Sequence, residues 1–351
     1  MTCAQRVAKY SGPSSEVIQR RAAVQDDQRL IDLQQWLRDD LGIAFETIAP
    51  ASCDASFRRY FRIEHAGESL IVMDAPPEKE DCEPFINIAN ALLKTGLNVP
   101  RILQQNLNFG FLLLSDLGSI QYLEQLNNES AERLYGDAFD ALLLMHRDNK
   151  NHAHLPPYDH ALLMKEMALM REWYVEKNLN ITLTTQQHTV LNISFELLAK
   201  SALAQPQVLV HRDYHSRNLM VVEKGNPGVL DFQDAVIGAI TYDLVSLLKD
   251  CYIKWSREQV LGWVSRYHQR LSEHGMIDNS SGAKFIKWFD FMGVQRHLKI
   301  LGIFSRLNIR DGKAGYLKDI PLTLAYVVEA CGLYDELKPL GELLDEIVTS
   351  G

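Results

Sequence analysis

Hydrophobic residues near the start of the chain recur first at helical spacing and then at strand spacing. The helical set is Leu30, Leu33, Trp36, Leu37 and Leu41, and Gly42 is placed to end that helix. From Phe45 onward the pattern predicts strands on both sides of a polar turn at 53–56, a third strand that stops at Pro76, and two more near 99–103 and 109–114. With a helix over 82–96, these segments predict a small α+β lobe of five strands and one helix.

Beyond residue 118 the pattern is mainly helical, with two short strands around residues 208–235. The expected helices lie at about 119–127, 130–148, 158–178, 184–203, 241–253, 256–274, 281–307 and 320–348. The predicted organisation is an N-terminal extension and helix at 1–39, a small lobe with a hinge at 40–118, and a larger helical lobe at 119–351.

Composition and charge narrow the class of protein. Of the 351 residues, 46% are hydrophobic and 23% charged, which is ordinary for a globular protein, and the net charge of −9 argues against a nucleic-acid partner. No apolar run reaches the roughly 18–20 residues of a membrane helix, and the N-terminus lacks the apolar core of a secretory signal. Five dispersed cysteines indicate free thiols, so the expected location is the cytoplasm, and no obligate protein partner is evident.

The stretch that carries chemistry is VLVHRDYHSRNLMVVEKGNPGVLDFQDA. It places Asp213 five residues before Asn218, and Asp231 follows the next apolar run. A phosphoryl-transfer site needs one carboxylate near the attacking hydroxyl, and a second carboxylate with an amide on the magnesium. Asp213 is therefore the candidate catalytic base, and Asn218 and Asp231 are candidate oxygen ligands of Mg²⁺.

The same residues also allow two simpler interpretations. One is a capped turn followed by a hairpin, without chemistry. The other is a transition-metal site, because alternate residues of a strand share a face and His211, Asp213 and His215 alternate. The metal-site interpretation leaves Asn218 and the Asp231 segment unexplained.

These motifs resemble the aminoglycoside phosphotransferase family over roughly residues 40–310, most closely at 208–250. Within that family, HRDYHSRNLMV and GVLDFQDAVIGAITYDLVSLLKD are most similar to the anomeric kinases of N-acetylmuramate and N-acetylglucosamine in peptidoglycan recycling. The resemblance implies a bilobal protein-kinase-like fold, ATP and Mg²⁺ as cofactors, and phosphorylation of an amino sugar at its anomeric hydroxyl. It also assigns Asp213 as base, Asn218 and Asp231 as magnesium ligands, and His211 and Asp243 as structural supports, although Asp243 could simply be a helix N-terminal acid.

The first lobe departs from the kinase pattern, which expects a lysine on the third strand to hold the nucleotide phosphates. No lysine occurs between Phe45 and Glu78, and Asp74 stands roughly where the family often has Lys or Arg. The turn that includes Ser56 lacks glycine, although its backbone amides could still face the phosphates. Arg58, Arg59 or Arg62 could supply the missing charge, oriented by Glu80 or Glu83, and Arg59 is favoured; exposed strand arginines without that role are the alternative.

Two further regions are expected to contact ligands. The segment 112–118 should recognise adenine through backbone groups, with Asp116 and Leu117 as the expected positions. Residues 294–318 hold six basic residues against one acid, and helical spacing places Arg296, Lys299 and Arg306 in one stripe, which would suit an anionic acceptor. A solvated basic face is the alternative.

Glu172 and Trp173 are the remaining candidate sugar contacts, although such a pair is more often part of a core. The leading hypothesis is an ATP-dependent amino-sugar kinase with a small-molecule acceptor. The competitors are a kinase of another alcohol, such as an aminoglycoside, choline or homoserine, a non-catalytic pseudokinase that acts as a binding module, and the metal site described above.

Overall fold

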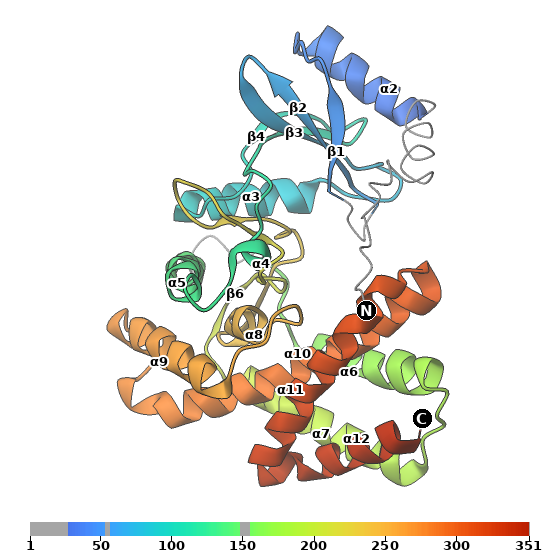
Figure 1. Cartoon of the computed structure of the whole chain (residues 1–351), viewed down its shortest axis with the longest axis vertical. Coiled ribbons are helices and arrows are strands. Elements are labelled where there is room, and N and C mark those ends of the chain that lie inside the picture. The colour runs from blue at the N-terminus through green and yellow to red at the C-terminus, as the bar shows by residue number, and fades with distance from the viewer. Residues whose placement is uncertain (1–26, 53–56, 148–154, 351) are drawn as a thin grey trace, which may run out of the picture. The chain divides into compact units, whose positions relative to one another are not determined.

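The computed structural model describes residues 27–52, 57–147 and 155–350. The chain divides into two compact units, coloured from blue to red along the chain in Figure 1. The sheet unit runs to Cys82 and takes in Ile102–Asp116, and the helical unit comprises Glu83–Arg101 and the chain from Leu117 onward.

The sheet unit is built on five antiparallel strands in the order β1-β2-β3-β5-β4. The strands are β1 (Ile48–Ser52), β2 (Arg59–His65), β3 (Glu68–Asp74), β4 (Ile102–Asn106) and β5 (Phe111–Ser115). The five predicted strands are confirmed, although the fourth begins at Ile102 rather than near residue 99.

Helix α2 (Gln28–Gln35) covers one face of this sheet. Its Leu30 and Leu33 pack in one buried cluster with Phe61 of β2 and Val72 of β3. The chain continues as one π-helical segment, Trp36–Asp40, and leaves the helix before Gly42, whose φ of 67° a side chain would disfavour. The helical prediction for this stretch is confirmed, and the helix contributes to the buried core of the sheet unit.

Successive side chains of β2 and β3 point to opposite faces of the sheet, and this determines which charged residues lie on the same face. Arg59 lies opposite Asp74 in the antiparallel register, and both fall on the face of Phe61 and Val72 that α2 covers. Arg62 therefore belongs to the opposite face, and Arg58 immediately precedes β2.

Helices dominate the helical unit, as predicted. They are α3 (Glu83–Thr95), α4 (Tyr122–Gln125), α5 (Ala131–Arg147), α6 (His160–Leu169) with its π-helical continuation η2 (Met170–Asn178), α7 (Thr185–Leu203), α8 (Tyr242–Leu248), α9 (Arg257–Glu273), α10 (Gly282–Asp311), α11 (Ile320–Leu333) and α12 (Lys338–Ser350). None of the helices in the described parts of the chain combines the length and apolar character of a membrane span.

Two boundaries differ from the sequence prediction. Helix α3 groups with the helical unit, where the Phe85 and Phe232 rings lie 4.9 Å apart between centroids. The single helix predicted over 320–348 is two helices, because Tyr334 takes an extended conformation (φ −130°, ψ 123°) between them. The hydroxyl of Tyr334 donates to Asp290 at 2.7 Å, so the break serves a tertiary contact.

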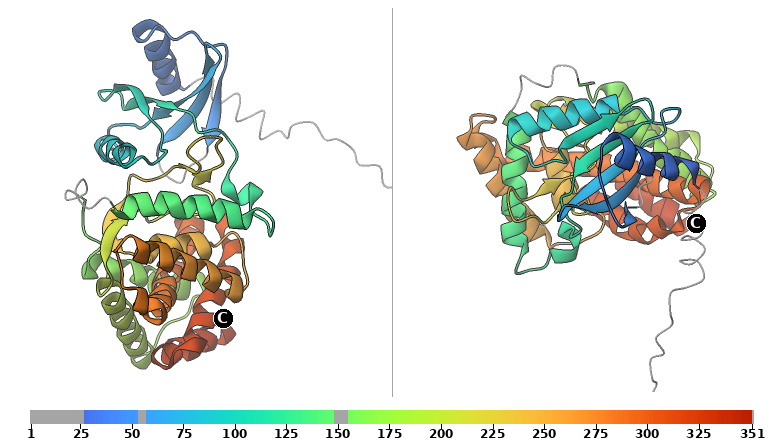
Figure 2. Two further views of the ribbon diagram at one scale, coloured as in Figure 1. Left: turned by 90° about the vertical axis from the view of Figure 1, so that its left-hand side faces the viewer. Right: turned by 90° about the horizontal axis from the view of Figure 1, so that it is seen from above.

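Helix α10 is the longest helix of this unit and packs against α6, η2, α7, α8 and α11 (Figures 1 and 2). Gly302 allows its close approach to the end of α6, since a Cβ there would lie 2.3 Å from the carbonyl carbon of Leu169. This approach brings the middle of α10 alongside α6 and next to the polar residues described below.

Candidate active site

Two short strand pairs bring the predicted catalytic segments together. Strand β6 (Gln207–Val210) pairs with β9 (Val236–Ala239), and β7 (Leu219–Met220) pairs with β8 (Gly228–Val229). The catalytic loop, His211–Asn218, joins β6 to β7, and Asp231 follows β8. The hydrogen bond from Leu230 N to Asn218 O, at 2.9 Å, ties the two segments.

Asn218 links the two predicted aspartates. Its Nδ2 donates to the backbone carbonyl of Asp213 at 3.0 Å and to Oδ2 of Asp231 at 3.3 Å. Nε2 of Gln233 donates to the other Asp231 oxygen at 2.7 Å. The three residues singled out in the sequence therefore lie in one small polar site.

Asp243, in the first turn of α8, lies directly behind the catalytic loop. Its carboxylate accepts hydrogen bonds from the backbone N–H groups of His211, at 2.7 Å, and of Arg212, at 3.0 Å. Burial raises the pKa of Asp243 to about 7, although both backbone donors act in the opposite direction. This is the geometry that the predicted supporting role requires.

His211 is buried within the same loop. Burial lowers its pKa to about 4, so the ring is neutral near pH 7. Its Nε2 lies 2.9 Å from the carbonyl of Leu230, and its Nδ1 accepts from the backbone N–H of Asp213 at 3.3 Å. The neutral ring with its proton on Nε2 satisfies both contacts and fixes the loop at Asp213.

Asp213 is held in its ionised form by positive charge around it. Burial alone would raise the pKa of Asp213, but nearby Lys299, Arg296 and Arg212 outweigh that effect and lower it to about 2. A carboxylate that stays ionised near pH 7 is ready to accept a hydrogen bond from a substrate hydroxyl.

Two residues of the site have left-handed backbone conformations. Arg212 has a φ of 77° and Asp231 a φ of 64°. Aspartate tolerates this region, but arginine enters it at a cost that its surroundings must offset. Both residues adjoin the predicted chemistry, as strained residues in active sites often do.

The chemistry of the donors fits magnesium better than a transition metal. Asn218 and Asp231 offer carboxamide and carboxylate oxygens, the hard donors that Mg²⁺ prefers. Among the described residues, no group of three His, Cys, Asp or Glu side chains is arranged to hold a metal ion. The alternation of His211, Asp213 and His215 therefore does not form a ligand cluster.

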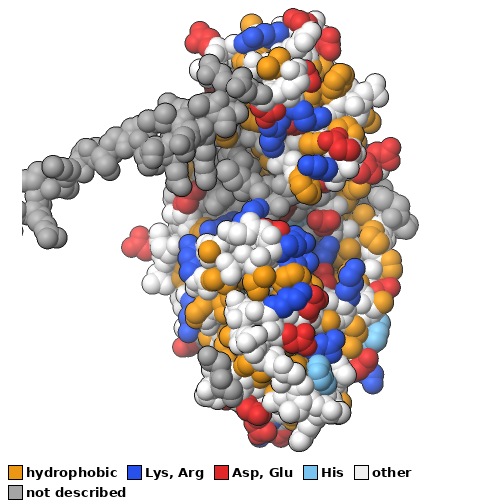
Figure 3. Space-filling model, turned by 90° about the vertical axis from the view of Figure 1, so that its right-hand side faces the viewer, with side chains coloured by type: hydrophobic (Ala, Val, Ile, Leu, Met, Phe, Trp, Pro, Cys, Tyr) orange, Lys and Arg blue, Asp and Glu red, His pale blue; other side chains and the backbone are white. Residues whose placement is uncertain are grey.

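The basic stripe predicted on α10 divides into buried and exposed parts. Arg296 and Lys299 are buried beside the catalytic loop, and Arg306 is half-buried. Nε and Nη1 of Arg296 have no hydrogen-bond partner among the described residues. Farther along, Arg310 pairs with Asp311 at the surface, and Figure 3 shows Lys and Arg side chains gathered on one face of the helical unit.

Glu166 of α6 is a buried residue of the site that the sequence analysis missed. Its carboxylate pairs with Arg212 of the catalytic loop and with Nζ of Lys299, the latter at 3.3 Å, and it accepts from the hydroxyl of Tyr158. The only signal in the sequence is an acid within the apolar stretch ALLMKEMALM, which says nothing about its partners.

Glu172 and Trp173, the predicted sugar contacts, lie farther along the same helical run in η2. Glu172 is exposed and pairs with Lys177 at 2.6 Å, and the Lys177 ammonium lies 3.5 Å from the centroid of the Trp173 ring. Both side chains therefore contact Lys177 of the same helical segment.

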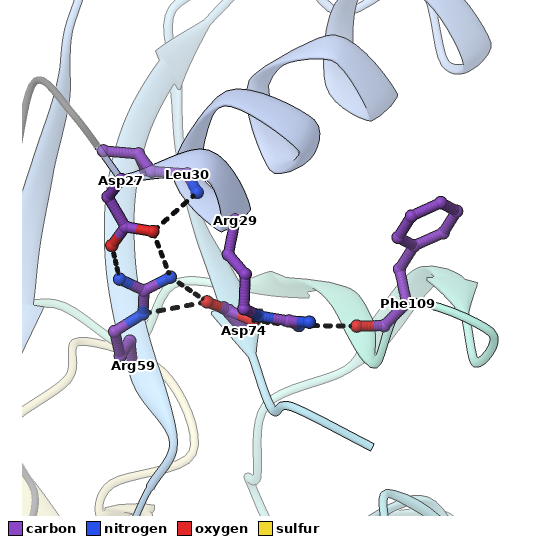
Figure 4. A network of polar contacts seen from close by, with 6 residues as sticks. All are labelled: Asp27, Arg29, Leu30, Arg59, Asp74 and Phe109. Atoms are coloured by element: carbon purple, nitrogen blue, oxygen red, sulfur yellow. Dashed lines mark hydrogen bonds and ion pairs between the residues drawn. The ribbon is translucent and has the colours of Figure 1, made fainter. Parts of the chain in front are cut away.

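In the sheet unit, Asp74 is completely buried between two arginines (Figure 4). Nε of Arg59 donates to Asp74 at 2.8 Å, and Nε of Arg29, from α2, donates at 3.0 Å. Arg59 also pairs with Asp27 at the start of α2. Arg59, the favoured phosphate ligand, is therefore bonded to two carboxylates on the face that α2 covers.

The neighbouring arginine has a different arrangement. Nη2 of Arg58 lies 3.0 Å from Glu80, and the backbone N–H of Phe57 donates to the same carboxylate at 3.2 Å. Glu80 was one of the two acids expected to orient an arginine. Ser56, the predicted amide contact, lies outside the described residues.

The two predicted hinge positions have separate surroundings. The carboxylate of Asp116 accepts from Nη2 of Arg62 at 3.0 Å and from the hydroxyl of Ser69 at 2.6 Å. The side chain of Leu117 lies against Gly228, where a Cβ would be 3.0 Å from its Cδ1. Side-chain contacts thus shape this segment, whereas nucleotide recognition was expected from its backbone.

The chain is similar to known proteins over most of its length. The N-acetylmuramate/N-acetylglucosamine kinase of Pseudomonas putida is 46% identical over 331 residues, which cover 92% of this chain and 97% of the relative. The kinases of the same name from Pseudomonas aeruginosa and Neisseria meningitidis serogroup B are 44% and 40% identical, over 91% and 92% of this chain and 97% and 96% of those proteins.

Solved structures share the fold at low sequence identity. An ethanolamine kinase from Plasmodium vivax has a TM-score of 0.62 at 12% identity, with 93% of this chain and 97% of that chain covered. A spectinomycin phosphotransferase in complex with ADP and its antibiotic has a TM-score of 0.61 at 13% identity, with 84% and 98% covered. The protein-kinase-like fold predicted from the sequence is confirmed.

The family model described as the phosphotransferase enzyme family matches residues 47–277, which include the catalytic loop, Asp231 and Asp243. Together with relatives above 40% identity that match most of the chain, this match identifies the protein as a member of the phosphotransferase enzyme family.

Proposed function

We propose that this protein is an ATP-dependent kinase that phosphorylates the anomeric hydroxyl of N-acetylmuramate, N-acetylglucosamine or both, for peptidoglycan recycling in the cytoplasm. The names of its relatives support the choice of acceptor. The observation that carries the proposal is the linkage of Asp213 and Asp231 by Asn218, because it joins the residues that we propose as the base and the magnesium ligands.

Asp213 acts on the acceptor in this proposal. Its ionised carboxylate accepts a hydrogen bond from the anomeric hydroxyl and orients that oxygen toward the γ-phosphorus of ATP. As the new P–O bond forms and the bond to ADP breaks, the proton passes to Asp213. A pKa of about 2 keeps Asp213 ionised before transfer.

Asn218 and Asp231 would hold Mg²⁺, which supplies neutralisation of the phosphate charge. The backbone conformation of Asp231, its contact with Asn218 and the bond from Gln233 fix the direction of the carboxylate. Positioning and charge neutralisation are the main sources of catalysis in phosphoryl transfer.

An anionic group on the acceptor suits the basic residues of α10. Arg296 offers buried N–H groups that the described residues leave unbonded, and buried donors favour a polar or charged partner. Arg306, half-buried, continues the same helix. The carboxylate of N-acetylmuramate would meet this charge, whereas a polycationic antibiotic would be repelled. Glu172 and Trp173 remain predicted sugar contacts.

The residues that we propose to bind the nucleotide phosphates lie in the sheet unit. Arg59 is the predicted phosphate ligand, but its carboxylate partners make Arg58, held by Glu80, the better candidate. Each carboxylate next to a cation offsets part of its attraction for a phosphate, and Arg59 has two such partners, Asp27 and Asp74. The backbone of Asp116 and Leu117 would contact the adenine.

The test is ADP release by the purified protein with ATP, Mg²⁺ and a panel of N-acetylmuramate, N-acetylglucosamine, choline and kanamycin. The two amino sugars are expected to support turnover, and their 1-O-methyl glycosides are not, because the reacting hydroxyl is blocked. Asp213→Asn should lower kcat by about a hundredfold or more while the protein stays folded.

Other results would redirect the proposal. Turnover with choline or kanamycin alone would assign a different alcohol, and ATP binding without turnover would indicate a pseudokinase. Equal activity on free sugars and methyl glycosides would exclude the anomeric position. Near-normal kcat in Asp213→Asn would remove Asp213 as the base.

A further inference from the structure

We propose that Glu166 is a positioning residue for phosphoryl transfer, which holds the side chain of Arg212 and thereby fixes the strained backbone that presents Asp213. This inference rests on the proposed function in one respect: its tests measure the rate of phosphoryl transfer. Nothing in the catalytic motif itself points to this residue, because it comes from helix α6.

A closed ring of contacts surrounds the backbone of Arg212. Its side chain pairs with Glu166, and Glu166 pairs with Lys299 of α10 at 3.3 Å. Nζ of Lys299 donates to the hydroxyl of Tyr242 at 3.2 Å. The next residue, Asp243, accepts from the backbone N–H of Arg212 at 3.0 Å. Arg212 is thus held at both its backbone and its side chain by one connected set.

The conformation of Arg212 explains why such a ring is needed. Its φ of 77° is unfavourable for a residue with a Cβ, and it persists only where neighbours over-determine it. Release of the side chain would let the backbone relax toward negative φ. Asp213 is the next residue, so this relaxation would move the carboxylate that meets the acceptor.

Burial makes the carboxylate of Glu166 hard to replace. Its side chain is 8% exposed and that of Lys299 is 7% exposed, so water cannot substitute for the lost partner. The hydroxyls of Tyr158 and Tyr242 and the amide of Gln295, which donates to Tyr158 at 3.3 Å, complete the surroundings.

The chain offers a matched control in Asp290 of α10. Its fully buried carboxylate also contacts one lysine, one arginine and one tyrosine: Lys249 at 3.0 Å, Arg257 at 2.8 Å and Tyr334 at 2.7 Å. None of these three residues belongs to the catalytic loop. Asp290→Asn therefore reproduces the loss of a buried carboxylate without the proposed connection to Asp213.

The first experiment compares Glu166→Gln with Asp290→Asn by steady-state kinetics and thermal unfolding. Both variants should lower the Tm. Glu166→Gln should lower kcat by about ten- to a hundredfold, with KM values for ATP and acceptor within about threefold, because misplacement of a reacting group acts on the chemical step. Asp290→Asn should keep kcat within about threefold of wild type. Similar kcat values for both variants would overturn the proposal.

The second experiment isolates the backbone of Arg212. Arg212→Gly removes the side chain but adopts positive φ without strain, whereas Arg212→Ala removes the side chain and keeps the strain. Arg212→Gly should therefore retain about tenfold more kcat than Arg212→Ala. The comparison of these two variants tests the proposal even if Glu166→Gln does not fold. Equal kcat values for Arg212→Gly and Arg212→Ala would contradict the proposed role of the backbone strain.

A double-mutant cycle then tests whether Glu166 acts through Arg212. In the Arg212→Gly background, Glu166→Gln should cost less than about threefold in kcat, since the strained residue that it holds is gone. A full additional loss would show that Glu166 acts independently of Arg212. Each value is a ratio to wild type for whichever acceptor the wild type phosphorylates, so a wrong sugar assignment changes the acceptor and leaves this test intact.

Discussion

Asp74 in the sheet unit and Glu166 in the helical unit are buried carboxylates with the same kind of partners. Each lies between two basic side chains, Arg29 and Arg59 for Asp74, and Arg212 and Lys299 for Glu166. The two sites differ in what the basic residues are attached to. Arg29 joins helix α2 to the sheet, whereas Arg212 precedes the candidate base.

Exposure reinforces this difference. The side chains of Arg29 and Arg59 are 29% and 35% exposed, so each reaches water at one side. The partners of Glu166 are more deeply buried. A buried ion pair can therefore connect secondary-structure elements, as at Asp74, or orient a reacting residue, as at Glu166. Its role depends on which residues adjoin the cation.

Loss of the carboxylate at Asp74 should act on stability. Asp74→Asn leaves Arg29 without its charged acceptor and leaves Arg59 with Asp27 alone, and we expect the free energy of unfolding to fall by about 1–3 kcal/mol. Partial exposure of both arginines keeps the loss below that of a fully buried pair. Denaturant unfolding measures the loss, and kcat should stay within about threefold of wild type.

Asp27→Asn is the control for that variant, because it removes a partner of Arg59 that is itself partly exposed. Its stability loss should be smaller than that of Asp74→Asn. A fall in kcat for Asp74→Asn as large as for Glu166→Gln would show that both carboxylates position the chemistry, and the contrast between the two sites would fail.

The sequence predicted best what depends on short-range pattern. Alternation and turn residues located the five strands, and helical periodicity located most helices. Asp213, Asn218 and Asp231 could be recognised because a short loop and a hairpin bring them together, so their spacing carries the geometry. The break at Tyr334 was missed because the cause is a contact with Asp290, far away in the chain.

Long-range pairs account for the rest of the site. Glu166 meets Arg212 and Lys299 only through the packing of α6 and α10, and no local pattern reports that contact. Arg59 was favoured over Arg58 without knowledge of the sheet register, which places it opposite Asp74. The face of a strand residue depends on its partners across the sheet, so one sequence leaves the two arginines hard to distinguish.

Two adjacent arginines, Arg58 just before β2 and Arg59 at its start, test the proposed contact with the nucleotide phosphates. Arg58→Ala should raise the KM for ATP by about tenfold, the effect of one lost charge-assisted contact. Arg59→Ala should change that KM by less than about threefold and should lower stability instead, because Asp74 loses a partner. The reverse pattern would restore Arg59 as the phosphate ligand and would give Asp74 a role in nucleotide binding.

The smallest effect is expected at Glu172, six residues beyond Glu166 in the same helical run. Its pair with Lys177 is exposed, and exposed ion pairs contribute roughly 0.2–1 kcal/mol. Glu172→Ala should therefore lower the free energy of unfolding by less than about 1 kcal/mol, with kcat unchanged. The KM of Glu172→Ala for the sugar also tests the predicted contact between Glu172 and the sugar. A rise of about threefold or more would place the acceptor at η2. An unchanged KM would indicate that the basic residues of α10, and not Glu172, recognise the acceptor. Glu166 and Glu172 would then differ as expected, because the buried acid supports the chemical step and the exposed acid does not.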